Sequence, residues 1–350
     1  MSASKPSMPE SLSPQGIMEM ATAFMRSRVL LTAYELDLFT VLGEESRSSS
    51  QVAHALGTDE RATDRLMNAL CAMGLLEKRE GRFSNTHLAS RILVKGKPDF
   101  MAGLMHMAHL WETWSTLTEA VRQGRSVVER AANVNERDSD WLRAFIVAMN
   151  WRARQHAPGV VSLLDLSDVS RVLDVGGGSG AYAMAFVRAK PDIAAVVFDL
   201  PNVIPLTQEY IRQEGLSDKV KTVVGDYGVD PLGGGFDLVF LSAIIHSNSP
   251  SQNRTLIRMA AEALAPHGQV VVQDFIMDED RTGPPFAALF ALNMLVGTEA
   301  GDTYTESEVR QWMEQEGLRH VVRKDTPFGT TLIIGKNGGG EGTRETASRR

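Results

Sequence analysis

The second half of the chain holds glycines and acids whose spacing could bind a nucleotide. The glycine-rich stretch DVGGGSG places Asp174, Gly176 and Gly178 directly after a short apolar run, and glycines let a backbone turn tightly against a ligand. Asp199 in VVFDLP and Asp226 in VVGDYG end the next two apolar runs. Carboxylates there can accept hydrogen bonds from nucleoside hydroxyl or amino groups. The pattern predicts a nucleotide site.

The glycine loop by itself fits two kinds of nucleotide. With Ala181 it also matches the dinucleotide pattern G-x-G-x-x-A, in which NAD brings a pyrophosphate to a helix N-terminus. S-adenosylmethionine has no phosphate and presents an amino-acid end and a sulfonium. Asp199, 23 residues after Gly176, suits the ribose of either cofactor, whereas few dinucleotide sites need the second acid, Asp226, for an adenine amino group. Two successive acids favour S-adenosylmethionine over helix-capping or loop carboxylates.

The elements that must position these residues form an α/β domain. Beyond residue 162, short β-branched runs alternate with helical stretches, and several runs are apolar on both faces, as in parallel strands covered by helices on both sides. The strands expected are RVLDVG, AAVVFDL, VKTVVGD, FDLVFLS, QVVVQDF, HVVRKD and TTLIIGK.

The first half of the chain has mainly helical periodicity. LLEKRE and GRFSNT around Gly81 predict a small hairpin after two helices, with serines capping the first helix, Gly57 ending it, and Thr58 or Asp59 starting the second. This is a winged-helix pattern, but its second helix begins with acids, which argues against a DNA reader. The segment 16–43 is apolar around most of its circumference, which implies a partner surface such as a second copy.

Composition excludes several classes of protein. The 350 residues, 43% hydrophobic, suffice for two domains. A net charge of -7 and a pI of about 5.7 disfavour nucleic acid as a partner. The single cysteine, Cys71, is expected to be a buried hydrophobic residue in a protein of a reducing compartment.

We expect a cytoplasmic protein without membrane segments. The apolar stretch 286–297 is shorter than the roughly 20 residues of a membrane span and is better interpreted as a buried helix. The stretches 1–15 and 337–350 have the composition of disordered tails.

The order and spacing of DVGGGSG, FDLP, GDY, FLSAIIH and MLVGTEAGDTYTESE resemble the S-adenosylmethionine-dependent small-molecule O-methyltransferases. These include plant phenylpropanoid and flavonoid enzymes, animal hydroxyindole O-methyltransferase and bacterial natural-product relatives. The similarity spans most of 16–336. It implies a dimerisation domain over 16–124, pocket-lining helices over 125–161, and a Rossmann-like catalytic domain over 162–336 with a mostly parallel seven-stranded sheet. It also implies S-adenosylhomocysteine as product, a homodimer and no metal.

The resemblance assigns roles to individual residues. His246 matches the catalytic base, and the acceptor pocket is matched by Phe145, Met149, Arg152, Met294 and Thr298. A phenol with a pKa near 10 is mostly neutral at pH 7, so an imidazole with a pKa near 6.5 can take its proton during methyl transfer. The alternative for His246 is an ordinary core histidine. The cofactor positions are Asp174, Gly176 and Gly178 in the loop, Asp199 and Leu200 at the ribose, Asp226 and Tyr227 at the adenine, and Ser242.

The sequence departs from the family near His246. Many relatives follow this histidine with an acid and tryptophan, whereas here Ser-Asn-Ser-Pro follows. Of two acids that steer the histidine in the plant enzymes, the first falls on Asp274 and the second on Thr303, with Glu299 and Asp302 as possible substitutes. Two alternatives therefore stay open: C-methylation or a non-methylating reaction on the same fold, and a winged-helix regulator with a vestigial cofactor domain. His106 and His109 lie one helical turn apart, but no carboxylate suits a metal site there.

Overall fold

Seven short apolar runs in the second half of the chain form a single sheet. The computed structural model describes residues 13–128 and 139–338. Each run expected as a strand is a strand, and the strands are β4 (Arg171–Val175), β5 (Ala194–Asp199), β6 (Val220–Val224), β7 (Phe236–Ser242), β8 (Leu264–Asp274), β9 (Leu318–Asp325) and β10 (Thr331–Asn337).

The strand order is β6-β5-β4-β7-β8-β10-β9, with β10 antiparallel to both of its neighbours and the other pairs parallel. The predicted mostly parallel seven-stranded sheet is thus confirmed. Pairing sets Val175 beside Phe198 and Leu241, and Ser242 beside Gln273. Because parallel strands end at one edge, the loops after β4, β5, β6, β7 and β8 all leave the sheet together.

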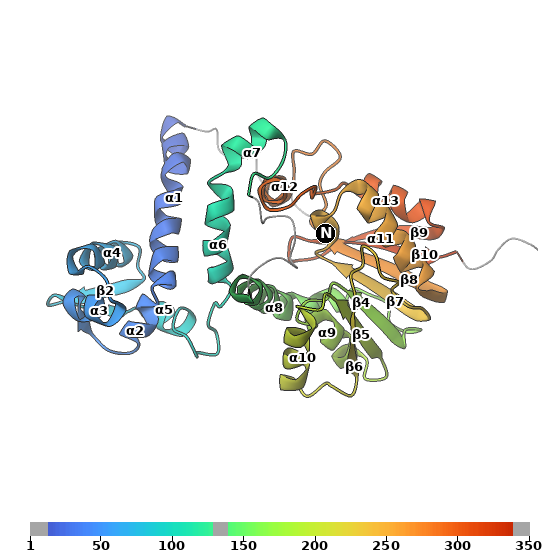
Figure 1. The fold of residues 1–350 in the computed structure, drawn as a ribbon, viewed down its shortest axis with the longest axis horizontal. Coiled ribbons are helices and arrows are strands. Elements are labelled where there is room, and N and C mark those ends of the chain that lie inside the picture. The colour runs from blue at the N-terminus through green and yellow to red at the C-terminus, as the bar shows by residue number, and fades with distance from the viewer. Residues whose placement is uncertain (1–12, 129–138, 339–350) are drawn as a thin grey trace, which may run out of the picture. The chain divides into compact units, whose positions relative to one another are not determined.

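Helices cover both faces of this sheet (Figure 1). On one face, side chains of β4, β7 and β8 pack against α11 (Pro250–Glu262) and α13 (Glu306–Gln315). On the other face, β5 and the alternate residues of β4, β7 and β8 pack against α8 (Ser139–Val161), α9 (Ala181–Ala189) and α10 (Ile204–Gln213). Strands buried on both faces explain why their sequences are continuously apolar rather than alternating.

The N-terminal part forms a helical unit with its own core. It contains α1 (Pro14–Glu35), α2 (Leu38–Leu42), β1 (Arg47–Ser48), α3 (Ser49–Leu56), α4 (Glu60–Ala72), β2 (Leu76–Arg79), β3 (Arg82–Asn85) and α5 (His87–Ile92). The hairpin around Gly81 is confirmed, and so are the caps: Ser48 caps α3, Gly57 ends it in the left-handed conformation, and Asp59 caps α4. Cys71 is half-buried against this core, whose buried members include Phe39, Leu42, Met67, Leu70 and Phe83.

Three features differ from the sequence interpretation. The segment 16–43 is two helices, because Asp37 adopts a left-handed φ of 61° between α1 and α2. A third strand, β1, pairs with β3, although two residues give no periodicity to detect. The helix expected to be buried, α12 (Pro285–Gly297), is buried only in part: Ala287, Met294 and Val296 are buried, whereas Phe286 and Leu289 are more than half exposed.

The chain divides into two units, residues 1–108 and 109–350. The helix α6 (Leu104–Trp114) crosses this boundary, and α7 (Leu117–Gln123) follows it. The predicted tails lie largely outside the described residues, as does 129–138 of the predicted connecting helices. Within the described ranges, no helix combines the length and apolarity needed to cross a membrane.

Candidate active site

The glycine loop after β4 is shaped so that only glycine fits. Gly176, Gly178 and Gly180 all have positive φ, at 61°, 56° and 75°, which strains any residue with a Cβ. A Cβ on Gly176 would also lie 2.4 Å from Ile244 Cδ1. β4 ends at Val175 and α9 begins at Ala181, so the loop joins a strand to a helix N-terminus as predicted. Its backbone is therefore free to approach a ligand closely.

Asp174 lies beneath this loop with no exposed surface. Its Oδ2 accepts a hydrogen bond of 3.1 Å from the backbone N–H of Ala183, whereas its Oδ1 is buried without a partner in the described part of the chain. The carboxylate thus faces the start of α9, and its predicted contact with the cofactor stays a prediction. Burial raises the pKa of Asp174 to about 7, and the charge of Asp199 contributes in the same direction.

This raised pKa predicts a pH-dependent stability. An unfolded aspartate has a pKa of about 3.9, so between about pH 4 and pH 7 the folded protein holds more protons than the unfolded one. The free energy of unfolding contributed by Asp174 must therefore fall as pH rises through that window. We expect Asp174→Asn to reduce the loss of melting temperature between pH 5 and pH 8, measured by calorimetry. Identical pH profiles for both proteins would contradict a titrating Asp174.

Asp199 ends β5 and links the strand to the glycine loop. Its Oδ2 accepts from the backbone N–H of Gly178 at 2.8 Å, and its Oδ1 accepts from the N–H of Leu200 at 2.7 Å. The residue is 8% exposed, and burial raises its pKa to about 6. Each carboxylate oxygen has a further lone pair, so the group can still accept hydrogen bonds from a ribose.

A cleft of about 640 Å³ opens beside the ends of β5 and β6, and Asp226 and Leu200 both line it. Asp226 Oδ1 accepts from the N–H of Gly228 at 2.8 Å, leaving its other oxygen for a donor such as an adenine amino group. Tyr227 is turned toward the glycine loop, and its hydroxyl donates to Asn248 Oδ1 at 3.2 Å. The remaining lining residues are Pro201, Asn202, Val224, Gly225 and Asp230.

The strongest catalytic geometry is a His-Asp pair after β7 and β8. His246 lies in the short turn Ile245–Ser247, and its Nδ1 is 2.8 Å from Asp274 Oδ1. The two side chains are 12% and 2% exposed. Because a carboxylate accepts, Nδ1 carries the proton, and Nε2 is left as the basic nitrogen. The ring of Phe290 meets the imidazole edge-on with centroids 4.9 Å apart. This arrangement can accept a proton from a bound hydroxyl.

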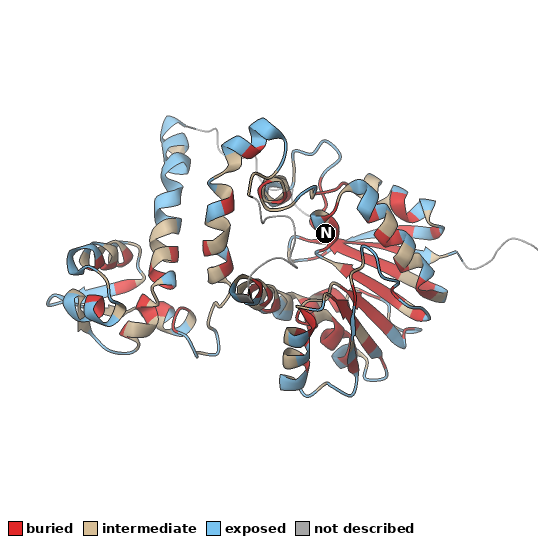
Figure 2. Cartoon of the chain, in the orientation of Figure 1, coloured by how far each residue is buried: buried red, intermediate tan, exposed pale blue. Residues whose placement is uncertain are grey.

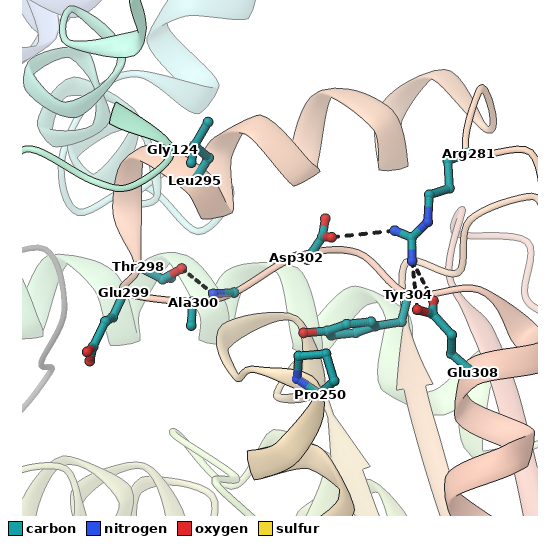
Figure 3. A pocket seen from close by; sticks show the side chains of 11 residues that line it. Gly124, Pro250, Arg281, Leu295, Thr298, Glu299, Ala300, Asp302, Tyr304 and Glu308 are labelled. Atoms are coloured by element: carbon teal, nitrogen blue, oxygen red, sulfur yellow. Dashed lines mark hydrogen bonds and ion pairs between the residues drawn. The ribbon is translucent and has the colours of Figure 1, made fainter. Parts of the chain in front are cut away.

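The described contacts of His246 include one acid, Asp274. Thr303 is buried, and its hydroxyl donates to the carbonyl of Ala287 at 3.3 Å. Asp302 instead approaches Arg281, at 3.4 Å, and Glu299 is exposed and turned away (Figure 3). Neither substitute considered for the missing family acid contacts the imidazole among the described residues. Both line a separate cavity of about 300 Å³.

The predicted acceptor-pocket residues come from two helices. On α8, Phe145 stacks on Trp141 with centroids 5.3 Å apart, Met149 is half-buried, and Arg152 lies over the ring of Phe275. On α12, Met294 is buried. Thr298 follows α12, donating to the carbonyl of Met294 and accepting from Gly301, so its hydroxyl closes the helix end.

Sequence reasoning missed a polar network that holds these loops. Gln273 Oε1 accepts from Ser242 at 3.0 Å, and its amide donates to Thr330 at 3.1 Å. Asn248 was considered only as a departure from the family, yet it contacts both Tyr227 and Asn253. An amide in a loop gives no pattern that reveals its partners.

Among residues 13–128 and 139–338, no group of three or more His, Cys, Asp or Glu could hold a metal ion.

Comparison with known proteins gives the same architecture. Models of the O-methyltransferase dimerisation domain and the O-methyltransferase domain match residues 18–95 and 114–319. The 3-hydroxy-5-methyl-1-naphthoate 3-O-methyltransferase of Streptomyces sahachiroi is 35% identical, over 92% of this chain and 95% of that protein.

Two solved structures are similar over nearly the whole chain. PigF with SAH has a TM-score of 0.85 at 26% identity, covering 93% of this chain and 100% of that one. Human N-acetylserotonin methyltransferase in complex with SAM has a TM-score of 0.82 at 27% identity, covering 95% and 100%. A model match over more than half of the chain and a relative of this identity show that the chain belongs to the S-adenosylmethionine-dependent O-methyltransferase family.

Proposed function

We propose that the protein transfers a methyl group from S-adenosylmethionine to a phenolic or enolic hydroxyl of a planar small-molecule natural product, with His246 as general base. The observation that carries this proposal is the 2.8 Å contact between His246 Nδ1 and Asp274 Oδ1. Parallel pairing brings this contact to the sheet edge that also holds the glycine loop and Asp199.

The residues present fit S-adenosylmethionine. The close approach of Gly176 to Ile244 leaves backbone rather than side chain to face the amino-acid end. Asp199 and Asp226 supply acceptor oxygens for ribose hydroxyls and an adenine amino group, and the cleft beside Leu200 and Asp226 offers room for a base. Solved relatives with SAH and SAM bound support the same assignment.

The reaction follows from the His-Asp pair. When bound, S-adenosylmethionine supplies a methyl group attached to a positively charged sulfur. As the acceptor oxygen bonds to that carbon and the carbon–sulfur bond breaks, His246 Nε2 takes the hydroxyl proton. Asp274 fixes the ring through Nδ1–H and stabilises the charge that the imidazole gains. Holding both reactants in line removes much of the entropic barrier.

The direct test uses S-adenosylmethionine labelled with ¹³C in its methyl group. The purified protein is incubated with hydroxynaphthoates and hydroxyindoles, acceptors chosen from the names of relatives. NMR then distinguishes methyl on oxygen, the expected result, from methyl on carbon. A labelled methyl group attached to a carbon of the acceptor would support C-methylation. Cofactor binding without methyl transfer would support a non-methylating reaction. Salt-sensitive DNA binding without cofactor binding would support the regulator instead.

We also propose that the protein is a homodimer formed through its N-terminal domain, in agreement with the matched dimerisation model. Much of α1 is exposed in the single chain (Figure 2). Its exposed apolar side chains, each more than half accessible, are Ile17, Met18, Met20, Phe24 and Met25. A contiguous apolar surface of this kind indicates a partner interface. DNA is not proposed as a partner, because α4 begins with Glu60 and also carries Asp64.

A charge within this surface is expected to dissociate the dimer. Phe24→Asp places a carboxylate in an apolar interface, where an unpaired charge is strongly unfavourable. Light scattering should give the mass of two chains for the natural protein and of one chain for the variant. Val322→Asp on β9, at another exposed apolar position, serves as the control and should keep the natural mass. A monomeric natural protein would contradict the proposal.

A further inference from the structure

Arg152 on α8 is a half-buried cation that lacks an anionic partner within the described ranges. Its guanidinium carbon lies 4.8 Å from the centroid of the Phe275 ring. Arg154, two residues further along the same helix, is exposed and pairs with Glu214 at 3.3 Å. Burial lowers the pKa of Arg152, while the nearby Tyr182 and Asp274 favour its charge. Burying part of a charged group is energetically unfavourable unless its N–H groups donate hydrogen bonds to an acceptor.

Aromatic rings connect this cation to the proposed base. Phe275 and Phe290 have centroids 4.7 Å apart, and Phe290 meets His246 at 4.9 Å. Arg152 and His246 therefore contact the same phenylalanine cluster, in which the two rings are tilted by 59° and Phe290 is partly exposed. An acceptor lying on this cluster with its hydroxyl at His246 could reach Arg152 with a second substituent.

Asp274 does not satisfy the guanidinium. Its Oδ1 accepts from His246 Nδ1 and from the N–H of Phe275, both at 2.8 Å, and no ion pair joins it to Arg152 in the part of the chain that the structure describes. The planar fork of arginine matches a carboxylate with two parallel hydrogen bonds.

We propose that Arg152 recognises a carboxylate on the methyl acceptor, so that the preferred acceptors are hydroxylated aromatic acids. This inference rests on the proposed function, since it places the acceptor hydroxyl at His246. It adds a requirement that the His-Asp pair does not impose: a negative charge on the acceptor, placed at Arg152 beside Phe275.

The test compares an acid with its neutral amide. The probes are 3-hydroxy-1-naphthoate and 3-hydroxy-1-naphthamide, and the proteins are the natural chain, Arg152→Gln, Arg152→Lys and the control Arg154→Gln. Calorimetry measures probe affinity for each protein loaded with S-adenosylhomocysteine, and methyl transfer gives kcat and KM. Arg152→Gln is expected to weaken acid binding by about 10- to 100-fold, the effect of losing a charged hydrogen bond, mainly through KM. Amide binding should not change.

The two remaining variants sharpen the assignment. Lysine at position 152 keeps the charge but not the fork, so it should restore part of the acid affinity. Arg154→Gln removes the same charge from an exposed site and should leave both probes unaffected.

Several outcomes would overturn the role of Arg152. These are no binding of the acid to the natural protein, equal binding of acid and amide to it, or an equal loss of both probes in Arg152→Gln, which would mean that Arg152 acts through Asp274. Normal S-adenosylhomocysteine affinity in each variant shows that its fold is intact. Failure of the natural protein to bind S-adenosylhomocysteine would instead refute the proposed function, so the two failures are distinguishable.

Discussion

Replacing His246 with alanine is expected to lower kcat for methyl transfer by about 100-fold or more, the usual contribution of a positioned general base. The affinity for S-adenosylmethionine should stay unchanged, because the proposed cofactor contacts come from the glycine loop, Asp199 and Asp226. Single-turnover kinetics with labelled cofactor measures the first quantity, and calorimetric titration measures the second.

Two further variants make this result specific. His54→Ala, at an exposed position on α3, removes a histidine elsewhere and should leave turnover intact. Asp274→Asn keeps the shape of the residue but weakens its hold on the protonated imidazole, so an intermediate loss of kcat is expected. Full activity of the His246→Ala variant would contradict the role of His246 as general base and would favour the alternative, an ordinary core histidine.

Asp199→Ala is expected to weaken cofactor binding by about 100-fold, because two hydrogen bonds from ribose to a charged acceptor are lost. The variant also leaves the N–H groups of Gly178 and Leu200 without their acceptor, which loosens the glycine loop itself. Titration with S-adenosylmethionine, S-adenosylhomocysteine and NAD measures the effect. Asp218→Ala, at an exposed acid after α10, is the control and should bind normally.

The same residue predicts how binding responds to pH. Burial raises the pKa of Asp199 to about 6, so the carboxylate gains a proton as pH falls through that value and loses acceptor capacity for the ribose. Affinity for S-adenosylhomocysteine should therefore decrease from pH 7.5 to pH 5. Asp199→Ala should show a flatter profile over this range. A natural protein that binds better in acid, or preferentially binds NAD, would contradict the assignment.

Apolar patterning predicted most of the fold because the central strands of the large sheet are buried on both faces. Runs such as Leu238–Leu241 and Val270–Val272 must be apolar throughout to lie between two helical layers, so their positions are visible in the sequence. Patterning did not predict β1, because two residues are too few to show a period. It also did not predict the break at Asp37, because a residue with left-handed φ leaves no trace in the spacing of apolar residues.

The site was predictable where a residue type is required by the backbone. Gly176 is needed because a Cβ would strike Ile244, and Asp199 follows a strand at the sheet edge where ligand groups collect. The partners of polar side chains were not predictable. Asp302 was considered as a substitute acid for His246, yet it approaches Arg281, and Thr303 bonds to α12 instead of the imidazole.

By itself the sequence determined the strand runs, the glycine loop, the two acids after neighbouring strands and the histidine after the fourth, since these depend on local conformation and burial. The tertiary structure alone decided that Asp302 pairs with Arg281, that Asp174 faces the interior and that Arg152 lies over Phe275. Such contacts can join residues more than a hundred positions apart, as Arg152 and Phe275 are. Their energies depend on distances of a few ångströms, which are set only when the whole domain packs.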